Sequence, residues 1–244
     1  MERVDPVALL LDNVDDWNSW LFRHRQQNWP IGPNLQGVDL SDRDLSGVNL
    51  TYCDLRGAKI AGANLGEAIL TETRFDGANL DRVNLRKARA VGAKFNKASL
   101  RFADLRESTL SQSPAQRSPY VDSADAIPDT VFIGADLEQA DLRNVDCTCT
   151  VFADARLCRA NLSNGRFSRA NFHEADLTEC DLSFANLERA DCRLAVFSTA
   201  NADNTNLQLD NLSGAVGLTR NFLRGAKLTD QTTLPEYARS LVEA

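Results

Sequence analysis

The 244-residue sequence has few of the side chains that most catalytic and metal sites need. It contains two histidines, His24 and His173, and neither lies in a pattern that pairs it with a nucleophile and an acid. The six cysteines do not form two close pairs, so their spacing indicates neither a zinc site nor a disulfide framework. No glycine-rich phosphate-binding loop is present. We therefore expect no enzyme activity, no cofactor and no metal site.

Long apolar runs are also missing, so no segment is expected to cross a bilayer. The amino-terminal MERVDPVALLLDN lacks a basic leader with a cleavage-type sequence, so we expect no signal peptide. Cysteines without a disulfide pattern favour a reducing, cytoplasmic location. The net charge of −7 argues weakly against direct nucleic-acid binding, because contact with phosphates needs a clustered positive field.

The feature that dominates the sequence is a five-residue repeat. A first block of sixteen units has apolar centres every five residues from Leu35 to Leu110, and every centre except Ala90 is Leu, Ile or Phe. A second block of seventeen units runs from Phe132 to Leu212. Three of its centres are small: Cys147, Cys192 and Ala202. In most units another small residue, usually Ala, stands two positions before the centre.

A period of five fits neither a helix nor an alternating strand, because the centres would not share one face in either. It fits a coil that turns a corner at every unit, so that each centre and each preceding small residue point inward. Such a coil buries its interior only by stacking on further coils. The large centre then fills the axis, and the small residue leaves room beside it at close-packed density.

These units resemble the pentapeptide-repeat family, whose units read roughly Ala-(Asp/Asn)-Leu-x-x. The match is seen as ADL at 103–105, 135–137 and 175–177, and as ANL at 63–65, 78–80, 160–162 and 185–187. The resemblance implies an all-β solenoid, a right-handed quadrilateral β-helix with four units per coil. Eight or so coils at a spacing of roughly 4.8 Å would make a rod about 40 Å long before its caps.

Residues 111–130 contain three prolines and interrupt the period, which predicts a loop. Either 17 residues are inserted at a corner, or one coil is replaced with two residues to spare. Insertion stacks five phenylalanines in one column: Phe75, Phe95, Phe132, Phe152 and Phe172. It also aligns a column of Asp and Asn, whereas the alternative breaks both columns, so we favour insertion. The expected organisation is a helical cap at 1–30, repeat blocks at 31–110 and 131–215 around the loop at 111–130, and a second cap at 216–244.

Both ends need caps, because an open coil exposes unpaired backbone. Residues 6–27 are expected to be helical, with Asp5 as N-cap and Pro6 at the first position. At least two of Trp17, Trp20 and Trp29 should pack on the first coil. At the other end we expect short helices at about 219–225 and 235–243. Family resemblance implies either a cap or a homodimer contact through four apolar residues there: Phe222, Leu223, Tyr237 and Leu241.

The Asp/Asn column has two interpretations. The first is structural, since these short side chains can bond to turn backbone or to one another. The second is an acidic surface on two neighbouring faces that imitates DNA phosphates. Its candidate residues are Asp39, Asp42, Asp44, Glu67, Asp81, Asp104, Glu107, Asp136, Glu138, Asp141, Asp176 and Asp181.

Two functional hypotheses follow. The first is a non-catalytic scaffold that presents rigid faces to a protein partner. The second, implied by the resemblance, is a DNA-mimicking ligand of a bacterial type II topoisomerase such as gyrase, which would protect that enzyme from quinolone antibiotics or peptide toxins. In the second hypothesis the loop at 111–130 would be an additional contact.

Overall fold

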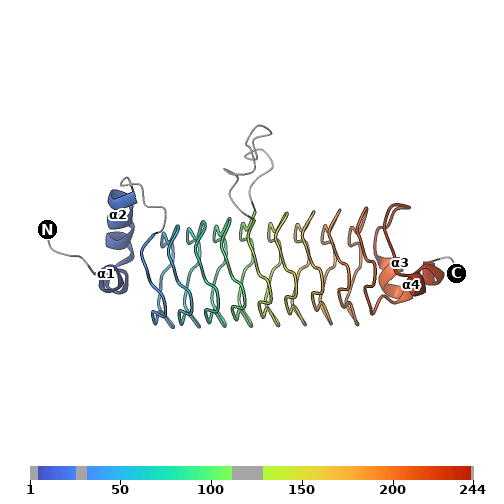
Figure 1. The fold of residues 1–244 in the computed structure, drawn as a ribbon, viewed down its shortest axis with the longest axis horizontal. Helices are drawn as coiled ribbons and strands as arrows, with labels where there is room; N and C mark the ends of the chain where they lie inside the picture. The colour runs from blue at the N-terminus through green and yellow to red at the C-terminus, as the bar shows by residue number, and fades with distance from the viewer. Residues whose placement is uncertain (1–4, 26–31, 112–128, 243–244) are drawn as a thin grey trace, which may run out of the picture.

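The computed structural model describes residues 5–25, 32–111 and 129–242, which form an elongated rod with a helical cap at each end (Figure 1). Between the caps every unit repeats one conformation: an inward small residue, an outward residue that pairs with neighbouring coils, an inward centre and two turn residues. Outward residues twenty positions apart pair, so four units complete one coil. The expected square β-helix is confirmed.

We number the four sides by the outward residues of the first coil. Face 1 holds Asn34, face 2 Asp39, face 3 Asp44 and face 4 Asn49, each with the residues that stack on it. A corner is named by the two faces that it joins, so residues 41–42 form the 2/3 corner of the first coil.

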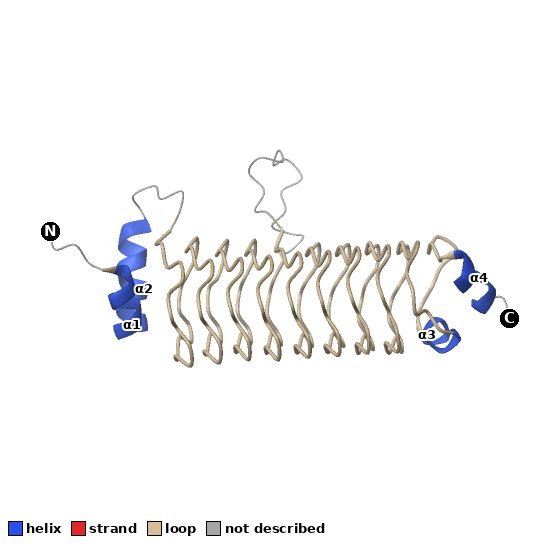
Figure 2. Cartoon of the chain, turned by 60° about the horizontal axis from the view of Figure 1, so that its bottom comes forward, coloured by secondary structure: helices blue, strands red, loops and turns tan. Residues whose placement is uncertain are grey.

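Backbone hydrogen bonds hold each coil to the next. Leu80 N–H donates to the carbonyl of Ser99 at 2.7 Å, and Ser99 N–H donates to the carbonyl of Ala78 at 3.0 Å. The same pattern recurs along the described coils, always through parallel bridges of one residue per side. Each side is therefore too short for a multi-residue strand, and Figure 2 shows the coils as stacked turns between the two helical caps.

The turn residues explain the repeated glycines at the corners. The second turn residue has a positive φ in every unit from Leu35 to Leu212 except the one interrupted after Leu110, as in Gly57 at 65° and Glu67 at 59°. Glycine adopts this conformation without steric cost, whereas residues with a Cβ adopt it only at a cost in free energy. The coil is regular enough to impose the conformation on side chains of every kind.

The centres form one continuous core, and Leu80, Leu162 and Leu182 are fully buried in it. The phenylalanines of face 1 stack with nearly parallel rings at centroid distances of 4.6–5.1 Å. Each aromatic pair contributes about 0.5–1.5 kcal/mol beyond burial of its area. Four cysteines lie at inward positions of the repeat, namely Cys53, Cys147, Cys180 and Cys192, and all four are buried.

The stack crosses the interruption without a change of register. Lys94 pairs with Val131, and the ring of Phe132 lies 4.6 Å from that of Phe95 at an interplanar angle of 3°. The predicted insertion of 17 residues at a corner is thereby confirmed. Most of the loop predicted at 111–130 lies outside the described residues, and the described residues on either side, Ser111 and Asp129, lie at the 4/1 corner. The predicted end of the loop at 130 was one residue too late, because Thr130 is buried at an inward position of the second block.

Thr130 fastens the chain where the second block begins. Its hydroxyl accepts the N–H of Gly92 at 3.0 Å and lies within hydrogen-bond distance of the carbonyls of Ala90, at 2.9 Å, and Leu110. Thr130 is itself buried, so its hydroxyl bonds to these backbone groups and not to water. This side chain therefore ties three coil segments together at the insertion.

The amino-terminal cap contains two helices, α1 (Pro6–Asp12) and α2 (Val14–Arg25), where one helix over 6–27 was expected. That expectation was wrong because Asn13 is extended, with φ −153°, and its side chain accepts the N–H groups of Asp15 and Asp16 as a cap for α2. The prediction for Asp5 is confirmed, since its carboxylate accepts the Val7 N–H at 2.9 Å. Residues 26 and 27 lie outside the described residues.

Helix α2 replaces a missing coil beneath face 4. The Trp17 indole N–H donates to the Asn49 carbonyl at 2.7 Å, and the Asn49 N–H donates to the side-chain oxygen of Asn18 at 2.8 Å. Trp17 is fully buried and Trp20 packs on the core, so two tryptophans contact the coil as expected. Trp29 lies outside the described residues.

At the other end, α3 (Arg220–Gly225) and α4 (Glu236–Val242) cover the last coil. Phe222 and Leu223 are buried, and the ring of Phe222 lies 5.2 Å from that of Phe197. The Tyr237 hydroxyl donates to the Ala215 carbonyl at 3.1 Å, and Leu241 packs on the core. All four apolar candidates thus contact the chain's own end, while a homodimer contact stays a prediction. Among the described residues, no helix is both long and apolar enough to cross a bilayer.

An acid occupies an alanine position near this cap. Asp210 is 1% exposed and takes the inward place that Ala170 and Ala190 take in the coils below. Its Oδ1 accepts the Ala190 N–H at 2.9 Å, but its buried Oδ2 makes no hydrogen bond among the described residues. Burial raises the pKa of Asp210 to about 8.

The first prediction concerns Thr130. Thr130→Val keeps the shape but leaves buried backbone groups without a partner, so it should lower the free energy of unfolding by about 1–3 kcal/mol in chemical denaturation. The matched control is Thr150→Val at the same position one coil later, where the buried hydroxyl makes no hydrogen bond among the described residues. Equal losses in the two variants would contradict the role of the Thr130 hydroxyl.

The second prediction concerns Asp210 and pH. Its folded pKa lies above the unfolded value of 3.8, so its contribution to stability is fully present below about pH 4 and is lost as the pH rises towards 8. Asp210→Ala should therefore raise the free energy of unfolding by about 2 kcal/mol at pH 8 and by much less at pH 4. The control Asp203→Ala removes an exposed acid from the same coil and should change the free energy of unfolding by less than about 0.5 kcal/mol. No gain for Asp210→Ala at pH 8 would refute the argument.

Candidate protein-binding faces

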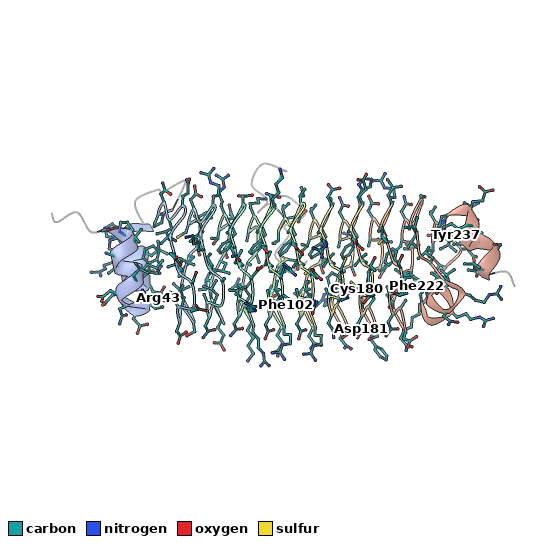
Figure 3. All side chains as sticks on the ribbon, turned by 90° about the horizontal axis from the view of Figure 1, so that it is seen from below. Arg43, Phe102, Cys180, Asp181, Phe222 and Tyr237 are labelled. Atoms are coloured by element: carbon teal, nitrogen blue, oxygen red, sulfur yellow. The ribbon has the colours of Figure 1, made fainter. Side chains whose placement is uncertain are left out.

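The twelve acids proposed from the sequence all lie on faces 2 and 3 or at the corners that border face 3. Face 2 carries Asp39, Asp136 and Asp176, and face 3 carries Asp44, Asp104, Asp141 and Asp181. The 2/3 corner carries Asp42, Asp81 and Glu138, and the 3/4 corner carries Glu67 and Glu107. The sequence pattern therefore brings them to one side of the rod. Figure 3 shows the rod from below, with Asp181 and Phe102 labelled.

The Asp/Asn column of face 3 binds the chain's own backbone. In all eight coils that it spans, the side-chain oxygen accepts the N–H of the residue two positions later. Asn64 also donates to Asp44, and Asn84 donates to Asn64, each at 2.8 Å. Hydrogen bonds from Ser46 hold the pKa of Asp44 below its usual value. The structural interpretation of this column is confirmed.

Arginines neutralise the middle of the acidic surface. Asp104 pairs with Arg106 at 2.6 Å, and Asp141 pairs with Arg143 at 2.7 Å. The hydrogen bond from Arg106 lowers the pKa of Asp104. Six of the twelve acids form ion pairs in all: Asp39, Asp104, Glu107, Asp136, Glu138 and Asp141.

Glu138 lies at the centre of the largest ion-pair cluster. Its carboxylate lies 2.6 Å from Arg156, 3.2 Å from Arg101 and 3.8 Å from Arg159. Burial alone would raise the pKa of Glu138, but the bond from Arg156 and the charges of Arg156 and Arg101 outweigh it and lower that pKa. The carboxylate thus serves as a bridge between arginines of successive coils.

The remaining acids make no ion pair among the described residues. They are Asp42, Asp44, Glu67, Asp81, Asp176 and Asp181. Four of them lie in the first three coils and two lie much farther along the rod, with the arginine-paired coils between them. The free negative charge is therefore split into two separate regions.

A polar groove of about 580 Å³ runs along the 3/4 corner of the first three coils. Its lining includes Gly47 and Gly66 together with the charged side chains of Glu67, Arg86 and Lys87. Asn84 contributes its amide to the same wall. The groove therefore offers both charges together with amide groups.

The ends of the insertion lie on the opposite side of the rod from the acids. Ser111 and Asp129 are at the 4/1 corner, which is diagonal to the 2/3 corner of the square coil. A partner that docks flat on faces 2 and 3 does not meet this corner. The acidic side of the rod and the 4/1 corner are therefore two separate surfaces.

The partly exposed thiol of Cys158 is poorly suited to nucleophilic chemistry. Cys149 and Cys158 lie at turn positions of the repeat and are partly exposed. Burial and a hydrogen bond from its S–H to Asp176 raise the pKa of Cys158 to about 11, so this thiol is protonated at neutral pH. Among the described residues, no group of His, Cys, Asp and Glu side chains is arranged to hold a metal ion.

The sequence did not reveal which surface residues act together. Each ion pair joins side chains of one unit or of adjacent coils, and the five-residue register alone would have placed them near one another. It does not determine which acceptor each flexible arginine chooses. Two exposed phenylalanines at turn positions, Phe102 and Phe184, were also overlooked, although their place outside the apolar columns marks them.

Comparisons with known proteins agree with this fold. A family model described as pentapeptide repeats matches in eight copies, within residues 34–112 and 129–214. These matches span both repeat blocks, so the expected right-handed quadrilateral β-helix is confirmed. A search of curated protein sequences found no match.

Solved structures of pentapeptide repeat proteins are similar to this chain, and those of HetL and QnrB1 are two of them. HetL, a pentapeptide repeat protein involved in heterocyst differentiation regulation in Nostoc sp. strain PCC 7120, is 23% identical; the alignment covers 87% of this chain and 97% of HetL, with a TM-score of 0.46. Full-length QnrB1, a plasmid-mediated fluoroquinolone resistance protein, is 17% identical; the alignment covers 86% of this chain and 97% of QnrB1, with a TM-score of 0.45.

Proposed function

The chain belongs to the pentapeptide-repeat family, and from this premise we propose that it is a non-catalytic scaffold whose β-helix faces bind a protein partner. The observation that supports this most strongly is the unbroken register of the coils, which continues across the insertion. A rod in which every coil is bonded to its neighbours presents surfaces that lose little conformational freedom on binding. Such faces can bind a partner without a conformational change in the rod.

The cysteines fit this proposal and a cytoplasmic location. All six are free thiols, and burial holds the pKa of Cys53 and Cys180 well above the usual value. Protonated, enclosed thiols act as small apolar side chains in the core rather than as nucleophiles.

The alternative is a DNA-mimicking ligand of gyrase. It requires a continuous row of uncompensated negative charge, because the enzyme would have to accept carboxylates in place of phosphates. Half of the candidate acids are paired with basic side chains, and the acids without an ion pair lie in two separated regions. These contacts favour the general scaffold over the DNA mimic.

A face-by-face substitution experiment tests the scaffold. One exposed outward charge is reversed on each side: Arg74→Glu on face 1, Lys59→Glu on face 2, Lys87→Glu at the 3/4 corner beside face 3, and Arg89→Glu on face 4. Each variant should keep the circular dichroism spectrum, because these side chains point away from the core. We expect a partner found by cross-linking in the source organism to lose about tenfold or more in affinity with one variant and little with the others.

Purified gyrase is tested with the same face variants as a candidate partner. We expect micromolar protein to leave its supercoiling activity unchanged, with and without a quinolone. If the protein protects gyrase from the quinolone and the variant of one face loses that protection, the DNA-mimic alternative is favoured. A failure of every face variant to change the binding of any partner would contradict the scaffold proposal.

A further inference from the structure

Phe102 is an apolar residue at a corner where every other described coil has a polar residue or glycine. The corresponding second-turn positions of the 2/3 corner are Asp42, Gly62, Arg82, Gln139, Arg159, Glu179 and Thr199. Phe102 is 42% exposed, and the centre of its unit, Leu100, already fills the core. Its ring therefore adds little to the interior.

The backbone at this position also disfavours a bulky side chain. Phe102 has φ 60°, a conformation that an aromatic residue adopts less readily than glycine or asparagine. Two coils earlier, Gly62 occupies the same turn position. Because the coil imposes this φ on second turn residues in general, the conformation does not by itself select phenylalanine here, and the exposure of the ring leaves it available for an external contact.

Two guanidinium groups flank the ring. The Cζ of Arg101 lies 5.5 Å from the centroid of Phe102, and the Cζ of Arg82 lies 5.8 Å from it. Such cation–π contacts hold the ring and both arginines in one cluster. Aromatic and arginine side chains are the residues that most often dominate the energy of protein interfaces.

The two arginines differ in their other contacts. Arg101 is fixed by Glu138 at 3.2 Å, and its backbone N–H donates to Asp81 at 3.0 Å. Arg82 is exposed and makes no ion pair among the described residues. One arginine therefore positions the ring, while the other still has its charge to offer to a partner.

We propose that Phe102, Arg82 and Arg101 form a docking anchor for an acidic protein segment that places an apolar side chain on the ring and a carboxylate on Arg82. This deepens the scaffold proposal and rests on it. The charge of Arg82 selects a carboxylate, and the exposed ring selects an apolar neighbour. A nucleic acid fits less well, because phosphate binding needs clustered positive charge, whereas Arg101 is already paired with Glu138 and only Arg82 of the two arginines lacks an ion pair among the described residues.

Selection from a library of short random peptides displayed on phage, with the full-length protein as bait, tests the anchor. We expect the enriched peptides to place Asp or Glu beside Leu, Phe or Trp. A synthetic consensus peptide should then lose about tenfold or more in affinity for Phe102→Asn and for Arg82→Glu. Asparagine suits the turn, since Asn144 and Asn164 occupy equivalent turn positions with φ 58° and 59°.

The matched control is Phe184→Asn. Phe184 is also an exposed phenylalanine, 61% exposed at φ 59°, but it lies at the 3/4 corner and forms no cation–π contact among the described residues. It should leave the affinity for the consensus peptide unchanged, and both asparagine variants should keep the wild-type melting temperature within a few degrees.

The proposal is overturned if no peptide is enriched, if the enriched peptides lack acids, or if Phe102→Asn binds as well as wild type. Binding of a thymidine oligonucleotide that Phe102→Asn abolishes would instead indicate a nucleic-acid site and would also overturn it. A partner mapped to another face, and unaffected by Phe102→Asn, would refute the anchor while leaving the scaffold proposal intact.

Discussion

The structure depends on the bonding of each coil to the next in one fixed register. A single square coil has one pairing residue per side and cannot enclose its own centres, so neither its backbone nor its core is satisfied alone. Stacking at an offset of twenty residues solves both problems at once, because the same step that pairs Asn64 with Asn84 also places Leu65 beneath Leu85. Every other feature of the molecule either continues this register or ends it.

The caps show how the register is ended. Trp17 and Asn18 supply a donor and an acceptor to Asn49, which replaces the contacts that a preceding coil would have made. At the other end Lys227 and Thr233 continue two of the ladders before α4 closes the rod. Open edges would otherwise pair with other chains.

The five-residue pattern was sufficient to predict a stacked coil because every inward position is chemically restricted, whereas the right-handed square form with four units per coil was implied by the family resemblance. The centres must be large, their neighbours small, and the phenylalanine column discriminates between the two ways of bridging the interruption. The break of the first helix at Asn13 was missed, because the apolar stripe continues past it and hides a capping side chain. Outward positions carry no such restriction, so the partner of an arginine such as Arg156 depends on side-chain geometry that spacing does not determine.

The same distinction governs function. In the sequence alone, the acids of faces 2 and 3 suggest a continuous negative surface. In the structure, Arg106, Arg143 and Arg156 neutralise the negative charge in the middle of that surface. Surface ion pairs of this kind contribute little to stability, but they decide what field a partner meets. A partner therefore meets a rod whose middle is neutralised by arginines, with separate acidic regions and an exposed ring between two arginines.

The most direct test of the central claim is to remove the insertion. Deleting residues 112–128 joins Ser111 to Asp129 and restores an unbroken five-residue phase, whereas deleting 112–129 shifts the second block by one residue. If register determines the fold, the first deletion keeps the wild-type circular dichroism spectrum and a cooperative thermal transition, and the second loses both stability and cooperativity. Equal behaviour of the two deletions would contradict the account.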